Sequence, residues 1–297
     1  MAATKRNHPE IDLESPASCD HMNMADIRDH IFRGVARRQV MVSMIADAEG
    51  IVAGTDALRQ AANELGLSID SLLEEGSFVR EGDEIGCFSG TPKQVAVAEE
   101  RLIGLTAKPS GIATAARRFV EKAGRRPEIV SGAWKKMPGS EKEMIRKAIS
   151  VGGARYGISQ EPFLFLDKNY VKMLGGVSES LRAVADLKGH VRVVQLKGAY
   201  GDIALEACEA VEHGADIVFI DSGKHDDLKR VGEKLRQSGL RDRVKIAFGN
   251  GIRLEDIESL KSLDVDILDI GRQIVDAPLL DMRMEVIHVG DGLGDVG

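Results

Sequence analysis

Two glycines stand where an apolar run, VKIAF, gives way to a helical pattern, RLEDIESLKSL. The junction reads AFGNGI and contains Gly249, Asn250 and Gly251. Glycine lets backbone N–H groups approach an anion closely, and a helix N-terminus adds favourable partial charge. The spacing therefore predicts a phosphate-binding loop, with a simple tight turn as the alternative. A second junction of this kind, DIGRQ, adds Gly271 and Arg272.

Charged side chains follow other apolar runs. Asp221 ends ADIVFID, where a carboxylate can hold Mg²⁺ or a sugar hydroxyl, although a solvated aspartate or a helix N-cap is the alternative. Lys135 and Lys136 follow PEIVSGA and stand beside the only tryptophan, Trp134. Two lysines next to an aromatic ring could clamp an anionic ring, although exposed lysines are often only solvated.

The remaining basic residues divide by position. Arg155 in GGARYG and Lys197 after VVQL extend the same basic lining, whereas Arg101 lies in a long helical passage, where arginines usually point to solvent. The seven histidines show neither H-x-x-x-H nor triad spacing, and the three cysteines show neither C-x-x-C nor metal spacing. The sequence thus predicts neither a zinc site nor a disulfide framework.

Composition bounds the class of protein. Of 297 residues, 43% are hydrophobic and 29% are charged, as in ordinary globular proteins, and no apolar run approaches the roughly 20 residues of a membrane span. Residues 1–24 are polar and lack an apolar segment, which predicts a disordered tail rather than a signal peptide. We therefore expect a cytoplasmic protein without a membrane partner. A net charge of −7 disfavours nucleic-acid binding and requires any anion site to be local.

Strands and helices alternate from about residue 127 onward. The predicted strands are 127–133, 162–171, 191–196, 215–221, 244–251 and 265–271. The helical patterns between them, several ending in glycine, are typical of a parallel sheet with covered faces. Residues 113–275 are therefore predicted to form an α/β barrel. An open doubly wound sheet is the alternative, but nothing in these runs resembles a dinucleotide fingerprint.

Residues 25–112 predict a separate α+β domain with a helix near 55–65. The passage AVAEERLIGLTAKPSGIATAARRFVEKAG is helical, with an interruption predicted at Lys108-Pro109-Ser110-Gly111. The tail, 276–297, contains one more strand-like piece, which we expect to return to the N-terminal domain.

Two stretches resemble quinolinate phosphoribosyltransferase, the carboxylating nicotinate-nucleotide pyrophosphorylase. AEERLIGLTAKPSGIATAARRFV resembles the Glu-Arg…Ser-Gly-Ile-Ala-Thr helix of that family, and KKMPGSEKEMIRKAISVGGARYG resembles the stretch after its Thr-Arg-Lys-Thr motif. The resemblance spans roughly residues 40 to 285. It implies an N-terminal α+β sandwich, an incomplete parallel α/β barrel and a homodimer or higher homo-oligomer. In such an assembly each site would include an arginine from the partner subunit. The implied activity transfers ribose 5-phosphate from phosphoribosyl diphosphate, with Mg²⁺, to a ring nitrogen of a small aromatic acid.

The resemblance also implies roles for single residues. Arg101 matches the Glu-Arg arginine, Lys135 the motif lysine and Arg155 the arginine of a His-Arg pair. Asp221 matches the metal or ribose carboxylate, and Gly249 and Gly271 match the phosphate loops. Lys135 and Asp221 are thus expected to be catalytic. The expected substrate-binding residues are Arg101, Trp134, Lys136, Arg155, Lys168, Gln195 and Lys197.

Several positions depart from the family pattern. Trp134 replaces the motif arginine, the histidine before Arg155 is absent, and the family's Lys-Asp-Asn-His reads Asp-Lys-Asn-Tyr, with Lys168 second. Gln195 replaces a glutamate on the fourth barrel strand, which should weaken Mg²⁺-diphosphate binding, and the Gly-Asp-x-Thr segment is missing. Each lost cation removes charge-assisted hydrogen bonds of about 1.5–3 kcal/mol, so we expect an acceptor other than quinolinate itself. A ring with fewer charges could stack on Trp134.

Other functions stay open. The region GGARYGISQEPFLFLDKNYVKML leans toward a related branch, the proteins encoded with molybdate transporters, as much as toward the quinolinate enzymes. A divergent barrel could bind a phosphorylated metabolite without transferring anything. A third possibility is an enzyme acting on a sugar phosphate, with Lys135 or Lys168 as an amine catalyst.

Overall fold

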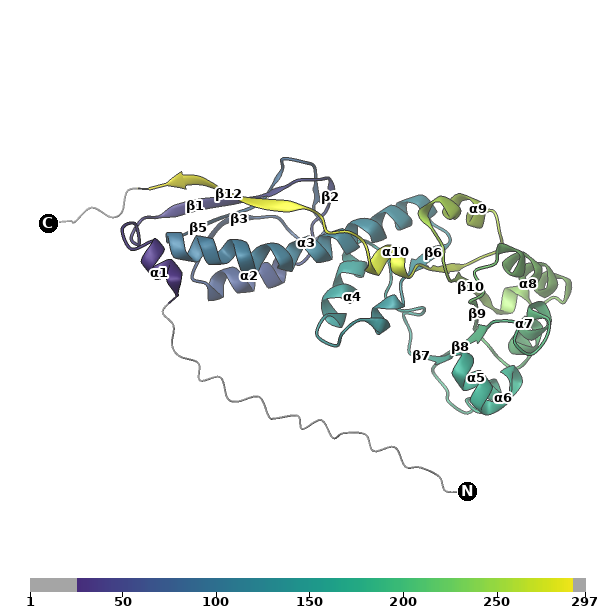
Figure 1. Cartoon of the computed structure of the whole chain (residues 1–297). Coiled ribbons are helices and arrows are strands. Elements are labelled where there is room, and N and C mark those ends of the chain that lie inside the picture. The colour runs from purple at the N-terminus through teal and green to yellow at the C-terminus, as the bar shows by residue number, and fades with distance from the viewer. Residues whose placement is uncertain (1–25, 291–297) are drawn as a thin grey trace, which may run out of the picture.

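The computed structural model describes residues 26–290. The predicted tail (1–24) and the last seven residues lie outside the described residues. Figure 1 shows an antiparallel sheet domain and an α/β domain joined by one long helix, α3 (Pro92–Ala123). Within residues 26–290, no helix combines the length and the apolar composition needed to cross a membrane.

The N-terminal domain is a four-stranded antiparallel sheet with helices on one face. Its strand order is β12-β1-β5-β3. The bounds are β1 (Val40–Ala46), β3 (Ser68–Leu72), β5 (Glu84–Gly90), β12 (Met282–Val289) and α2 (Thr55–Glu64), with a separate pair formed by β2 (Gly50–Ile51) and β4 (Phe78–Val79). Strand β12 pairs with β1 along its whole length, so the C-terminal strand completes the N-terminal sheet.

Helix α3 continues through Pro109, so the interruption predicted at Lys108–Gly111 is wrong. Proline removes one helical hydrogen bond, but tertiary contacts hold this segment on both sides. Ser110 Oγ accepts a hydrogen bond from the backbone N–H of Ala53 at 2.9 Å, and Lys108 Nζ donates to the Ala277 carbonyl at 2.8 Å. These contacts fix the helix where its sequence alone predicts a break.

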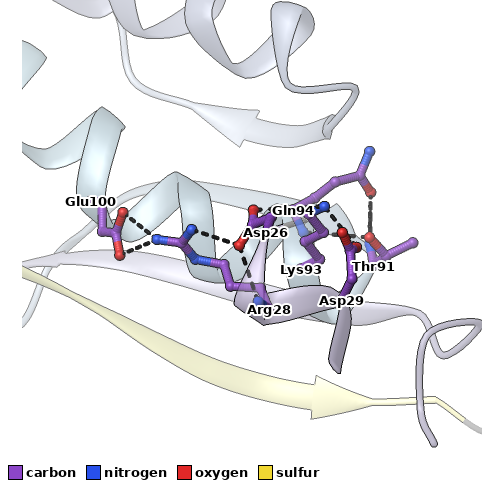
Figure 2. A network of polar contacts seen from close by, with 7 residues as sticks. All are labelled: Asp26, Arg28, Asp29, Thr91, Lys93, Gln94 and Glu100. Atoms are coloured by element: carbon purple, nitrogen blue, oxygen red, sulfur yellow. Dashed lines mark hydrogen bonds and ion pairs between the residues drawn. The ribbon is translucent and has the colours of Figure 1, made fainter. Parts of the chain in front are cut away.

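The short helix α1 (Ile27–Ile31) is attached to the N-terminal end of α3 by charged side chains (Figure 2). The Arg28 guanidinium donates to both carboxylate oxygens of Glu100, at 2.5 and 2.6 Å. Lys93 Nζ lies 2.7 Å from Asp29 Oδ1. The α3 side of the contact is fixed by a capping box formed by Thr91 and Gln94.

The second domain is an incomplete parallel α/β barrel, which confirms the predicted fold class. Its strand order is β6-β11-β10-β9-β8-β7. The first strand therefore lies beside the last and the others follow in sequence order, which is barrel connectivity and rules out the doubly wound alternative. The barrel stays open between β6 and β7, where Arg155 forms a single parallel bridge to Val130 of β6.

The barrel elements follow the predicted alternation. The strands are β6 (Glu128–Val130), β7 (Phe163–Leu166), β8 (Val191–Leu196), β9 (Ile217–Ile220), β10 (Lys245–Gly249) and β11 (Ile267–Asp269). The helices are α4 (Lys142–Val151), α5 (Lys168–Leu174), α6 (Val177–Arg182), α7 (Ile203–Glu212), α8 (His225–Gln237), α9 (Ile257–Lys261) and α10 (Arg272–Val275), with 3₁₀ turns at Ala133–Lys136, Arg241–Arg243 and Leu254–Asp256.

One predicted strand, 162–171, is too long. It ends at Leu166 because Asp167 caps helix α5, where its Oδ1 accepts the backbone N–H groups of Asn169 (2.7 Å) and Tyr170 (3.1 Å). Aspartate is a strong N-cap residue. Residues 168–171 thus belong to the helix at the carboxyl end of β7.

Alternation along each strand separates two apolar cores. The larger lies between the strands and the surrounding helices. The smaller fills the barrel interior with side chains such as Val193, Ile217, Phe219 and Ile267, against which Phe165 packs. Because side chains two apart on a strand share a face, the residues that follow these at the carboxyl ends point into the barrel mouth.

Candidate functional site

A cleft of about 1900 Å³ opens at the carboxyl ends of the barrel strands. This is the end at which α/β barrels place their sites. Most of the residues predicted from sequence line it: Trp134, Lys135, Lys136, Arg155, Lys168, Gln195, Asp221, Asn250, Gly251, Gly271 and Arg272. The fold therefore gathers side chains from segments up to 138 residues apart in the chain into one cavity.

The cleft is locally basic in an acidic protein. Seven arginines and lysines line it, against five aspartates and glutamates, while the whole chain carries −7. A concave site with an excess of one charge concentrates ligands of the opposite charge. The cleft can thus attract an anion that the rest of the surface repels.

The Asp221 carboxylate is held in the cleft by two neighbouring side chains. Its Oδ2 accepts a hydrogen bond from Gln195 Nε2 at 2.5 Å and forms an ion pair with Lys197 Nζ at 2.8 Å. The Gln195 carbonyl oxygen in turn accepts the backbone N–H of Lys168 at 2.8 Å. Gln195 therefore connects the carboxyl ends of β8 and β9 with the start of α5. These contacts fix the orientation of the Asp221 carboxylate.

Lys197 itself does not line the cleft; its Nζ also donates to the backbone carbonyl of Asp221 at 3.1 Å. Its loop is supported by Glu206, which accepts the backbone N–H groups of Gly198 (3.2 Å) and Tyr200 (2.7 Å). Burial raises the pKa of Glu206 above its ordinary value, although these two hydrogen bonds oppose the shift. Sequence reasoning did not identify Glu206, because nothing in its helical pattern distinguishes it from a surface residue.

Aromatic rings close the floor of the cleft. Phe165 and Phe219 meet edge to face with ring centroids 5.8 Å apart, and Lys135 Nζ lies 4.7 Å above the Phe165 ring. Gly249 does not line the cleft, because it lies beneath this floor. A Cβ at Gly249 would lie 2.8 Å from the Phe219 ring, so the packing of β9 against β10 requires glycine there.

The predicted phosphate loop has an unusual backbone. Asn250 and Gly251 both have positive φ, at 81° and 82°, and Asn250 is the single non-glycine residue with positive φ within residues 26–290. Such a residue costs conformational energy, and these costs concentrate at functional sites. The preceding loop, after β9, packs closely against it, since a Cβ at Gly223 would lie 2.6 Å from the Asn250 carbonyl oxygen.

Asp269 is a carboxylate that sequence reasoning missed. It ends β11, and its Oδ1 accepts the backbone N–H of Gly132 at 2.8 Å. Burial raises its pKa, the Gly132 hydrogen bond and Lys135 oppose the shift, and Asp221 adds to it. A signal existed, because Asp269 is a polar residue inside the apolar run VDILDIG, two positions before Gly271.

Two of the predicted basic side chains, Arg155 and Arg272, are paired with acidic side chains of the protein. Arg155 Nη2 lies 2.9 Å from Glu128 Oε2 and donates to the Ile158 carbonyl at 3.0 Å. The Arg272 side chain is 92% exposed at the rim, with Nε 3.4 Å from Asp276 Oδ2. Their charge is therefore partly neutralised before any ligand arrives.

The structure does not bring Arg101 to the cleft of its own chain. Arg101 is exposed on α3, where it directly follows Glu100, the residue whose carboxylate binds Arg28. Two cleft arginines were missed by sequence reasoning: Arg146 on α4 and Arg253 after β10. Arginines at such positions give no sequence signal, because charged residues are common on helices and in loops.

Metal-binding capacity in the cleft is small. Within residues 26–290, no group of three or more histidine, cysteine, aspartate or glutamate side chains could hold a metal ion. Mg²⁺ often takes only one or two carboxylates and completes its shell with substrate phosphates and water. Asp221 and Asp269 fit that mode, although Lys197 and Gln195 already bind one oxygen of Asp221.

Comparison with known proteins agrees with this geometry. The family model of the N-terminal domain of quinolinate phosphoribosyl transferase matches residues 26–110, and the model of its C-terminal domain matches residues 112–285.

Two archaeal relatives cover most of the chain. A probable carboxylating nicotinate-nucleotide pyrophosphorylase of Methanothermobacter thermautotrophicus is 26% identical over 253 residues, which are 84% of this chain and 88% of that protein. Its counterpart in Archaeoglobus fulgidus is 25% identical over 256 residues, which are 86% and 97% of the two chains.

A solved structure shows the same fold. The crystal structure of nicotinate-nucleotide pyrophosphorylase from Pyrococcus furiosus superposes with a TM-score of 0.79 at 19% identity, covering 93% of this chain and 77% of that one. Since the two domain models together match most of the sequence, this chain belongs to the quinolinate phosphoribosyltransferase family.

Proposed function

We propose that this protein transfers ribose 5-phosphate from phosphoribosyl diphosphate to the ring nitrogen of a small aromatic acid other than quinolinate. The observation that carries the proposal is the fixed Asp221 carboxylate beside the strained Asn250–Gly251 loop, in a cleft with excess positive charge. Family membership supports the phosphoribosyltransferase reaction and the two kinds of substrate.

The proposed reaction is a displacement at C1 of the ribose. The lone pair of the acceptor nitrogen forms the new bond to C1, while the bond from C1 to oxygen breaks and diphosphate leaves with that electron pair. Positive charge develops on the ribose ring between these events. Asp221 and Asp269 are the carboxylates of the cleft that can stabilise it.

Phosphate groups are assigned to the basic and backbone donors. The N–H groups around Gly251 and Gly271 are positioned for the 5-phosphate, and Lys135 and Lys136 for the leaving diphosphate. Mg²⁺ bound with the diphosphate, touching Asp221, would neutralise part of its charge. We expect a weak requirement, because Gln195 stands where the family has a glutamate.

Quinolinate is a poor match for the cations that remain. Trp134 is uncharged, and Arg155 is paired with Glu128 at 2.9 Å. At these two positions, where the family pattern places arginines, a dicarboxylate would therefore find no unpaired guanidinium, which is costly in a partly buried site.

We also propose a homodimer in which Arg101 enters the site of the partner subunit. The support is its place on the exposed side of α3, away from the cleft of its own chain, together with the role that the family resemblance implies.

The test is release of diphosphate from phosphoribosyl diphosphate and Mg²⁺ in the presence of a panel of aromatic acids. We expect release with at least one acid, little with quinolinate, and loss of release in Lys135→Ala. No release of diphosphate with any acid would contradict the transferase. A rise in melting temperature on adding phosphoribosyl diphosphate, without turnover, would favour a binding protein. Borohydride trapping of a lysine with a sugar phosphate would favour the amine-catalyst alternative.

A further inference from the structure

Arg146 is held in the cleft by two aromatic rings. Its guanidinium carbon lies 4.9 Å from the centroid of the Trp134 ring and 5.8 Å from that of Tyr156. The two rings meet edge to face at 6.4 Å, and Trp134 Nε1 donates to the Tyr156 carbonyl at 2.7 Å. Three segments, the turn after β6, helix α4 and the loop after Arg155, thus form one fixed cluster in the cleft wall.

The charge of Arg146 has no protein acceptor among the described residues. None of the side-chain hydrogen bonds and ion pairs within residues 26–290 uses Arg146, whereas Arg155 is bound to Glu128. A guanidinium that stacks on a ring uses its face and keeps the N–H groups of its edge free. That edge is the planar fork that binds a carboxylate through two parallel hydrogen bonds.

The neighbouring lysines face other groups. Lys135 lies above Phe165, and both Lys135 and Lys136 are close enough to the half-buried Asp269 to oppose the rise of its pKa. These two cations therefore act at the floor of the cleft. At the part of the cleft wall formed by Trp134 and Tyr156, the cation is Arg146. A flat ring can lie against Trp134, next to Arg146.

We propose that Arg146, positioned by Trp134 and Tyr156, binds the carboxylate of the acceptor, and that the cleft prefers planar rings with a single carboxylate. This inference rests on the proposed transferase function and specifies its second substrate. A second carboxylate on the ring would meet the uncharged surface of Trp134 and Tyr156, and the arginine next to Tyr156, Arg155, is already paired with Glu128, which disfavours dicarboxylates.

Trp134 supplies the measurement, because it is the only tryptophan of the chain. Its fluorescence is titrated with pyridine-3-carboxylate, pyridine-2,3-dicarboxylate and pyridine-3-carboxamide. We expect saturable binding of the monocarboxylate, with the dicarboxylate at least several-fold weaker. In Arg146→Gln the monocarboxylate should bind about 10- to 100-fold more weakly, while binding of the carboxamide stays unchanged. Arg146→Lys should be intermediate, because lysine keeps the charge without the fork.

Lys147→Gln is the matched control. Lys147 is exposed on the same helix, 3.8 Å from Glu143, so its loss should not alter binding. Melting temperatures of all variants verify that they fold. Unchanged binding of the monocarboxylate to Arg146→Gln, tighter or equal binding of the dicarboxylate to the wild-type protein, or no fluorescence response to any acid would each overturn the inference.

The diphosphate assay separates this inference from the proposed function. Turnover with an acid whose binding does not depend on Arg146 would overturn the inference and leave the transferase intact. Arg146-dependent binding without any diphosphate release would contradict the transferase and leave the assignment of the carboxylate site.

Discussion

The carboxylate of Asp269 accepts a hydrogen bond of 2.8 Å from the backbone N–H of Gly132, so the last barrel strand is bound to the end of the first. Burial raises the pKa of Asp269 against the effect of that hydrogen bond. A partly buried carboxyl with a shifted pKa at the mouth of a charged cleft is a frequent sign of a functional residue.

Asp269→Asn should lower turnover and raise stability. An aspartate whose pKa rises on folding contributes stability below its unfolded pKa, and this is lost as the pH rises through the folded value. The variant should therefore melt at a higher temperature than wild type at pH 7, and the gain should vanish as the pH falls toward about 4. We expect diphosphate release to fall at least about tenfold, because the amide cannot stabilise positive charge as a carboxylate does. Equal melting temperatures at both pH values would contradict this account.

Gly249→Ala should strain the floor of the cleft. The added Cβ would lie 2.8 Å from the Phe219 ring and 3.3 Å from Asp269 Cβ, so we expect a loss of about 1–3 kcal/mol in the free energy of unfolding. Gly34→Ala is the control, because a Cβ there has no atom within 4 Å and φ is not positive. Adding Phe219→Leu should recover part of the loss, and additive effects in urea unfolding would rule out the contact as the cause.

Gln195→Glu should make the cleft more dependent on Mg²⁺. The amide donates at 2.5 Å to Asp221, and a glutamate there would place two carboxylates side by side. We expect a lower melting temperature without the metal, recovery on adding Mg²⁺, and a lower Mg²⁺ concentration for half-maximal diphosphate release. If Mg²⁺ does not change the melting temperature of the variant, a metal position beside Asp221 is contradicted. Gln94→Glu, far from the cleft in the α3 capping box, serves as the charge control.

Mixing two inactive variants tests the shared site. In the proposed dimer, each site takes Lys135 from one subunit and Arg101 from the other, so Arg101→Ala and Lys135→Ala remove contributions of different subunits. Hybrid dimers carry one site without either change, so refolding the two variants together should restore about a quarter of wild-type activity. Each variant refolded alone serves as the control. No recovery, with mixed dimers verified by differential tags, would show that each chain uses its own Arg101 or none.

Arg241 should stabilise the barrel in a pH-dependent way. Burial disfavours the charged form of Asp264, but hydrogen bonds from Arg241 and Arg236 outweigh it and hold the pKa of Asp264 below its ordinary value. Such a carboxyl contributes stability above its unfolded pKa, and this is lost as the pH falls through the folded value. Arg241→Met should cost about 1–3 kcal/mol at pH 7, and the difference from wild type should narrow below about pH 4.

Arg230→Met is the surface control for that prediction. Arg230 and Asp202 form a pair at 2.5 Å with side chains 44% and 40% exposed, so its loss should cost under about 1 kcal/mol. Equal losses in the two variants at pH 7 would show that Arg241 acts as another surface cation.

The sequence by itself determined the repeating strands and helices, and with them the strand ends at which the site lies. Apolar runs alternating with helical patterns are a local property, so β8 and α8 occur close to where periodicity predicts them. The same reasoning placed Asp221, Lys135 and Gly251 at strand ends, and barrel topology brings all strand ends to one mouth.

Tertiary structure alone decided which of these residues meet. Pro109 stays inside a helix because both sides of α3 are packed. Gly249 lies beneath the floor of the cleft because the Phe219 ring occupies the space that a side chain would need. Asp269 reaches Gly132 only through the closure of the barrel, which joins strands distant in sequence, and Arg146 reaches Trp134 only through the packing of α4 against the turn that precedes it. Local patterns carry no information on such pairs, because a contact between segments depends on how the whole chain packs.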